Sequence, residues 1–169
     1  MKPRHVTLPE EGASGRSLPA SLLAAFTLAG ALGALPAAAQ FAQVPSPVSA
    51  GTPPPSAAAE VAAYRMEAAR HVYASFPTRI HKGKLPPMMY AVMITEADIE
   101  PDGTVAGVRV IRGPAAATEV TPWVVSLIRR AAPYPAPVKM DGGKATWREI
   151  WLVDKTGLFQ VDALTEGQR

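Results

Sequence analysis

The chain of 169 residues contains no cysteine, so it can form neither a disulfide nor a thiolate metal site, and it offers no attachment site for a lipoprotein lipid. Charged residues make up only 18% of the sequence, and the formal net charge is +3. The sequence also lacks a basic stripe interleaved with aromatic residues, so we expect no nucleic-acid partner. The folded part must therefore be stabilised by its hydrophobic core alone.

Catalytic and metal-binding patterns are missing as well. His71 and His81 are ten residues apart and have no carboxylate pair at a ligand spacing, and Ser126 has no Gly-x-Ser-x-Gly surroundings. We therefore expect a non-enzymatic protein without a cofactor or a metal ion. The alternative is a small hydrolase or ligand-binding protein whose site combines His81 with the acidic residues of segment 98–102.

The N-terminal region has the pattern of an exported protein. An apolar run at residues 21–35 is followed by the small residues 37–39, which predicts a signal peptide over residues 1–39, cleaved after Ala39, and a periplasmic protein. The alternative is an uncleaved inner-membrane anchor over residues 18–39. Residues 40–56 are rich in Pro, Ala and Ser, which predicts an extended linker.

Residues 90–112 predict a β-hairpin. The runs 90–99 and 104–112 are rich in β-branched residues and alternate in polarity, as half-buried strands do. Pro101, Asp102 and Gly103 lie between them, and each favours a chain reversal.

A helix is predicted after the hairpin, because apolar residues from Val120 to Ala131 recur at helical spacing. Thr121 and Pro122 are suited to the N-cap and the first helical position. The proline-rich run at residues 133–137 prevents the helix from continuing.

Further strands are predicted at residues 146–153 and 158–164, and an N-terminal helix at residues 57–76. The expected fold is α+β: a small two-layer sandwich in which an antiparallel sheet of three to four strands (β-β-α-β-β) packs against one helix, with a preceding N-terminal helix. This domain occupies residues 57–165, and residues 166–169 form a tail that frays.

The hairpin with its Pro-Asp-Gly turn, the following Val108-Arg109-Val110 and the run RRAAPYPAP at residues 129–137 together resemble the C-terminal domain of the TonB family. These periplasmic proteins of Gram-negative bacteria pass energy from the inner membrane to outer-membrane transporters. The resemblance covers residues 64–164. It implies a protein partner, such as an outer-membrane receptor or another envelope protein, whose extended segment joins a sheet edge. In the family that edge belongs to the last strand, here residues 146–153, and the extra strand at 158–164 is expected to cap it.

The third predicted strand carries Trp147, Glu149 and Trp151 on one side. Together with Phe159 and Val161 they are the candidate partner-binding residues, at the strand edge and on an aromatic surface. Core packing is the alternative for the tryptophans.

Two further hypotheses stay open. One is a membrane-anchored energy transducer of the TonB type, although residues 18–39 lack the histidine that such anchors usually carry. The other is self-association through sheet edges into a homodimer.

Overall fold

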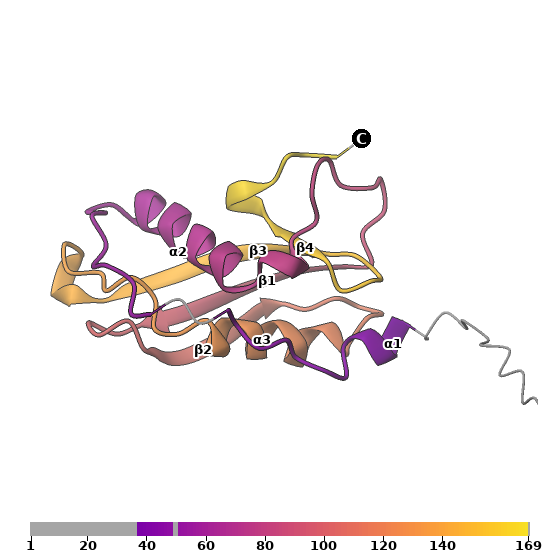
Figure 1. Cartoon of the computed structure of the whole chain (residues 1–169), viewed down its shortest axis with the longest axis horizontal. Coiled ribbons are helices and arrows are strands. Elements are labelled where there is room, and N and C mark those ends of the chain that lie inside the picture. The colour runs from indigo at the N-terminus through magenta and orange to yellow at the C-terminus, as the bar shows by residue number, and fades with distance from the viewer. Residues whose placement is uncertain (1–36, 49–50, 169) are drawn as a thin grey trace, which may run out of the picture. The chain divides into compact units, whose positions relative to one another are not determined.

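The computed structural model describes residues 37–48 and 51–168 (Figure 1). Its helices are α1 (Ala37–Gln40), α2 (Val61–Ser75) and α3 (Val120–Arg130), and its strands are β1 (Ala91–Ile99), β2 (Val105–Arg112), β3 (Ala145–Val153) and β4 (Phe159–Val161). Three short 3-10 helices follow α2, precede β3 and follow β4: η1 (Pro77–Arg79), η2 (Asp141–Gly143) and η3 (Asp162–Leu164).

The four strands form one antiparallel sheet in the order β2-β1-β3-β4. β1 pairs with β3 along its whole length, from Ala91 opposite Val153 to Ile99 opposite Ala145. β4 is short and pairs only with the last three residues of β3, Trp151 to Val153. The predicted α+β fold, with an antiparallel sheet, a packed helix after the hairpin and a preceding helix, is confirmed.

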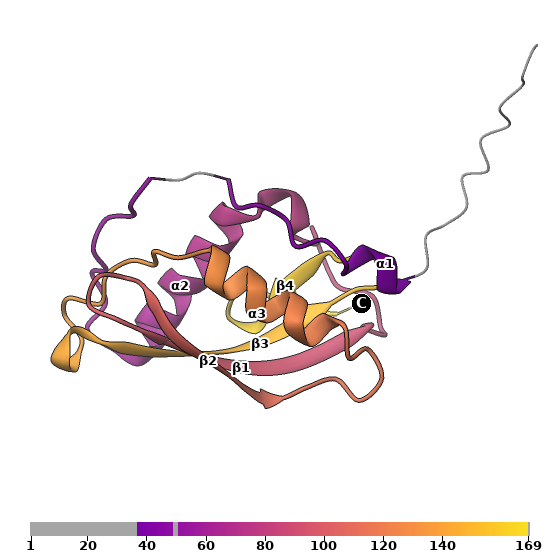
Figure 2. The same cartoon turned by 90° about the horizontal axis from the view of Figure 1, so that it is seen from below.

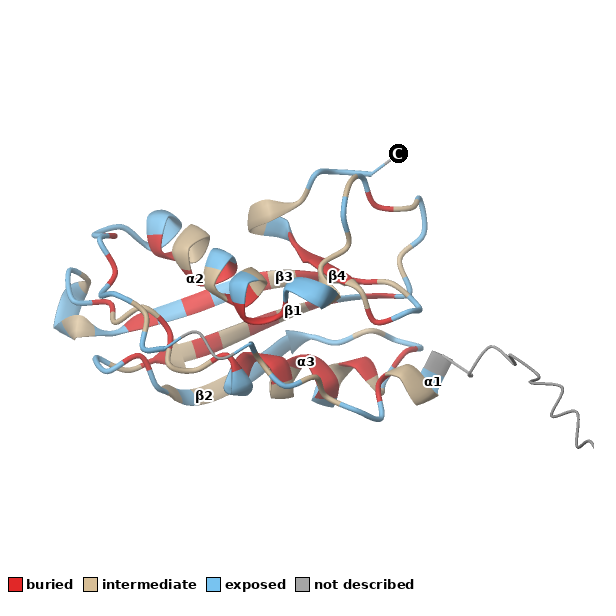
Figure 3. Ribbon diagram, in the orientation of Figure 1, coloured by how far each residue is buried: buried red, intermediate tan, exposed pale blue. Residues whose placement is uncertain are grey.

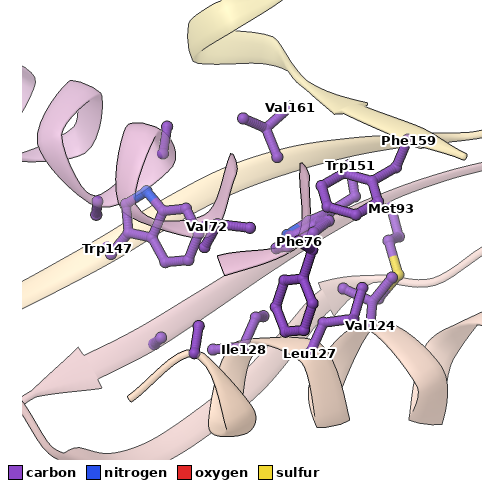
Figure 4. Close-up of a cluster of buried hydrophobic side chains, with 14 of the residues drawn as sticks. Val72, Phe76, Met93, Val124, Leu127, Ile128, Trp147, Trp151, Phe159 and Val161 are labelled. Carbon is purple, nitrogen blue, oxygen red and sulfur yellow. The ribbon is translucent and has the colours of Figure 1, made fainter. Parts of the chain in front are cut away.

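Both long helices cover the same face of the sheet. Alternate residues of β1 and β3 are buried, and these are the odd-numbered ones in each strand (Figure 3). α2 packs over β3 and η3, whereas α3 packs over β2 and β1. Figure 4 shows the resulting core, in which Phe76 lies between Trp151 and Leu127, and Val72 lies beside Trp147.

The hairpin turn is tied to the chain beyond α3. Gly103 has φ +83°, and a Cβ at this position would overlap the carbonyl oxygen of Tyr134. The Tyr134 amide donates to the carbonyl of Gly103 at 2.8 Å, and the Thr104 amide donates to Oδ1 of Asp102 at 2.9 Å. The turn chemistry predicted from the sequence is therefore present, and the proline-rich run holds the turn in place.

Some element boundaries differ from the predictions. α3 begins at Val120 after Glu119, so Thr121 and Pro122 lie inside its first turn, where a missing amide costs no helical bond. The last strand ends at Val161, not at Leu164, because η3 begins at Asp162.

The proline-rich segment before α2 packs on the domain in its described part. Phe41 is only 6% exposed and contacts Trp123 edge to face, with ring centroids 5.2 Å apart. Nε1 of Trp123 donates to the carbonyl of Gln43, and Arg130 donates to the carbonyl of Val44 at 2.9 Å. The predicted linker therefore packs on the domain over residues 41–48, because Phe41 supplies an apolar side chain that is buried there.

The predicted signal peptide or anchor lies almost entirely outside the described residues. Within residues 37–48 and 51–168, no helix has the length and apolar character needed to cross a bilayer.

Candidate functional site

The outer edge of β3 is unpaired over most of its length. β4 covers only Trp151 to Val153, so residues 145–150 have no strand neighbour on this side within the described chain. The Ile150 amide bonds Oε1 of its neighbour Glu149 at 3.0 Å, which shows that this amide points away from β1. Because amides alternate in direction along an antiparallel strand, those of Thr146 and Arg148 point to the same free edge.

A groove of about 490 Å³ runs along this edge. Its far wall is the first turn of α2, where Val61 is 64% exposed. Its remaining lining comes from the start of α2, from β3 and from η3: Ala62, Arg65, Thr146, Arg148, Glu149, Ile150 and Asp162. An extended peptide beside β3 would therefore have sheet backbone on one side and apolar helix surface on the other.

Glu149 closes the groove at the end nearest β4. Its side chain is fully buried, and Oε1 accepts hydrogen bonds from Arg65 at 2.5 Å and from the amides of Ile150 and Ala163 at 3.0 and 3.3 Å. Oε2 is buried without a partner among the described residues. Burial raises the pKa of the Glu149 carboxyl, and the bonds from Arg65 and from the two amides oppose that rise only in part.

Arg65 joins three elements at this point. Its Nη2 atom contacts Glu149 on β3 and Oδ2 of Asp162 on η3, the latter at 2.8 Å. The hydrogen bond to Glu149 is the main reason that the pKa of Arg65 is raised, so the guanidinium stays charged. The cation fixes the start of η3 against α2 and ends the groove there.

The sheet face opposite the helices adjoins the same edge. At its centre Glu96 accepts from Arg109 on β2 at 2.9 Å and from Arg148 on β3 at 2.8 Å, which lowers the pKa of Glu96. Val92, at the start of β1, is exposed on this face. A strand added to β3 would therefore place alternate side chains near α2 and near this face.

The five predicted partner-binding residues are all buried. Trp147, Trp151, Phe159 and Val161 belong to the hydrophobic core, where the rings of Trp151 and Phe159 lie 5.1 Å apart (Figure 4). The expectation of an exposed aromatic surface is therefore wrong, because these side chains lie on the face that α2 and α3 cover. Of the five, Trp147 and Glu149 lie within the unpaired stretch of β3, but their own amides point toward β1. Sequence reasoning missed Arg65, Val61 and Thr146.

The alternative site built from His81 and the acidic turn does not form. His81 contacts Asp154 at 3.3 Å, beside the end of β3, whereas the acidic turn follows the far end of β1. The nine residues of β1 separate the two groups, a span of about 26 Å at the usual rise per residue. Within the described residues, no cluster of His, Asp or Glu has the arrangement of a metal site.

Comparison of the chain with protein-family models, with curated proteins and with solved structures finds no match.

Proposed function

We propose that this domain binds a partner protein by adding an extended segment of that partner to the free edge of β3. The observation that carries the proposal is the unpaired stretch 145–150 beside a groove of about 490 Å³. Unpaired strand edges are sites of strand addition, in which main-chain hydrogen bonds give affinity and alternate side chains give selectivity.

The groove favours a short partner segment. The outward amides of Thr146 and Arg148 are free for a partner, but the Ile150 amide already bonds Glu149. An added strand would therefore pair with about four or five residues of β3 before Glu149 and η3 stop it. Its side chains would alternate between the apolar wall at Val61 and Ala62 and the charged face at Arg148.

The resemblance to the TonB C-terminal domain supports the same mode of binding at the same strand. It suggests a periplasmic adaptor that engages an outer-membrane receptor or another envelope protein. Of the two functions that the resemblance suggests, energy transduction has less support than an adaptor role. Phe41 and Arg130 hold residues 41–48 on the domain, which shortens the linker that a transducer would need to reach across the periplasm. A second copy of the chain, paired through the same edge, is the competing occupant.

Thr146→Pro tests the proposal. Proline removes an edge amide that points away from β1, so the β1–β3 ladder is expected to survive. Thr146→Val is the matched control, since it keeps the amide at the same position. A photo-reactive residue at position 61 should crosslink a partner in cells in the parent and Thr146→Val chains, and mass spectrometry would identify that partner.

We expect the crosslink to be lost in Thr146→Pro, while circular dichroism shows a folded domain. An undiminished crosslink in the folded proline variant would refute strand addition at β3. A crosslink to the chain itself would assign the edge to a homodimer. Hydrogen exchange adds a direct reading of the edge: the amides of Thr146 and Arg148 should exchange much faster than those of Trp147 and Glu149.

A further inference from the structure

A second surface lies at the end of the sheet far from the β1–β2 turn. There the loop before β1 meets the turn between β3 and β4, around a hollow of about 450 Å³ lined by residues that include Met88, Met89 and Lys155. The side-chain amide of Gln160 holds the loop in place, because its Nε2 atom donates to the carbonyls of His81 and Gly83 at 2.9 and 2.8 Å. We call this surface the basic end.

Unpaired cations give the basic end its charge. Lys82, Lys84 and Lys155 are exposed, and within the described chain no carboxylate oxygen lies within 4.0 Å of their ammonium groups. By contrast, Lys144 near the opposite end is paired with Glu100 at 2.8 Å.

The carboxylates at the basic end already have partners. Asp154 contacts His81 and accepts from the amide of Thr156 at 2.7 Å. Glu166 accepts from the amide of Gly83 at 3.1 Å, and Glu119 accepts from the hydroxyl of Tyr90 at 2.5 Å. These bonds leave the carboxylates charged, but within the described residues none of the three lies within 4.0 Å of a lysine ammonium group, so the lysines can bind anions from outside the molecule.

An exposed apolar side chain lies among these cations. Met88 is 87% exposed, which is the largest exposure among the big hydrophobic residues of the described chain. Lysines keep their charge at the level of lipid headgroups while apolar groups enter the acyl boundary, so this combination suits a membrane surface.

The N-terminal part of the chain reaches the domain at this same end. The ring of Phe41 stacks on Tyr90, with centroids 5.8 Å apart and planes 5° apart, and α1 lies at the same end of the sheet as the loop before β1 (Figures 1 and 2). The anchor alternative predicted from the sequence, residues 18–39, ends two residues before Phe41. An uncleaved anchor over residues 18–39 would be separated from Phe41 by Gln40 alone.

We propose that the basic end docks on anionic lipid headgroups at the surface of a membrane. The Lys82, Lys84 and Lys155 ammonium groups bind the lipid phosphates, and Met88 enters the interface. This surface is separate from the β3 groove, so the proposal stands or falls independently of strand addition. It would hold the domain in one orientation, with the basic end against the lipid.

Single-cysteine labelling tests the docking in the full chain, which contains no other cysteine. A polarity-sensitive fluorophore is attached at Met88→Cys or, as the matched control, at Ala106→Cys, an exposed position near the opposite end. Vesicles contain either phosphatidylcholine alone or a mixture with phosphatidylglycerol. We expect a blue shift of the label at position 88 with the anionic vesicles only, and no shift at position 106.

Substitution of the lysines separates docking from insertion of the apolar run. Replacing Lys82, Lys84 or Lys155 by glutamine should reduce the ratio of docked to undocked label about fivefold per lysine, from the usual contribution of a basic residue near an anionic surface. High salt should have the same effect. Equal shifts at positions 88 and 106, a shift in phosphatidylcholine alone, or a shift that survives the triple glutamine variant would each overturn the proposal.

Discussion

Replacing Glu149 by glutamine or by alanine separates charge from hydrogen bonding at the end of the β3 groove. In Glu149→Ala the amides of Ile150 and Ala163 lose their acceptor, and Arg65 loses its buried partner. Breaking a buried pair of this kind typically costs about 3–5 kcal/mol. Arg65 is 33% exposed and keeps Asp162, so we expect a loss near the lower limit, about 3 kcal/mol.

Glu149→Gln should cost much less. The amide oxygen can take the position of Oε1 and keep all three donors, while the NH₂ group takes the position of Oε2, which has no partner to lose. The charge of the pair with Arg65 disappears, and the buried NH₂ group replaces an oxygen that already lacked a partner, so we expect a loss of about 1 kcal/mol. Urea denaturation followed by tryptophan fluorescence measures both variants, because Trp123, Trp147 and Trp151 are buried.

The pH dependence gives a second reading of the same site. Burial raises the pKa of Glu149 in the folded state, so the folded protein holds this proton more tightly than the unfolded chain does. The contribution of Glu149 to the free energy of unfolding therefore becomes smaller as pH rises from the unfolded pKa to the folded pKa. The free energy of unfolding of the parent, relative to that of Glu149→Gln, should therefore fall as pH rises over this range. Above the folded pKa the difference should stay constant.

Two results would refute this account of Glu149. One is a glutamine variant as unstable as the alanine variant, since hydrogen bonding would then not be the dominant contribution. The other is a parent whose stability relative to Glu149→Gln increases with pH through the same range, since the pKa would then be lowered by folding.

Three further changes test other parts of the fold. Gly103→Ala should destabilise the domain by about 2–4 kcal/mol, from left-handed strain plus overlap with Tyr134, whereas Gly142→Ala, also at positive φ but in open space, should cost about 1 kcal/mol; thermal unfolding compares them. Phe41→Ala should cost about 3 kcal/mol and expose residues 42–48 to limited proteolysis, and unchanged cleavage would show that other contacts hold the segment. Tyr64→Phe removes the hydroxyl that donates to the Pro135 carbonyl at 2.9 Å and should cost about 1 kcal/mol in urea.

The hairpin and α3 were predictable because their signals are local. Turn residues at 101–103 and the helical spacing that starts at Val120 act within a few positions of the chain. The alternation that put Trp147, Glu149 and Trp151 on one side of β3 was also correct. Which side the helices would cover depends on how the whole sheet packs, and for that reason the tryptophans were candidates for both the core and the surface.

The free edge was not predictable from the sequence. Alternation continues through residues 158–164, and a strand of that length would have covered most of β3. The observed end of β4 depends on Arg65, which is 84 positions from Glu149 and 97 from Asp162 along the chain. The docking of Phe41 is likewise set by contacts with Tyr90 and Trp123 far along the sequence.

The same contacts explain why β3 keeps an open edge. Beyond Val161 the chain leaves the sheet, and the amide of Ala163 bonds the Glu149 carboxylate. Asp162 turns toward Arg65 on α2, which draws the chain away from the sheet and starts η3. The Ile150 amide is likewise occupied by Glu149, so β4 cannot be extended by one more pair without breaking this cluster. The buried carboxylate thus both ends the last strand and leaves residues 145–150 unpaired, which makes Glu149 the residue on which the proposed docking edge depends.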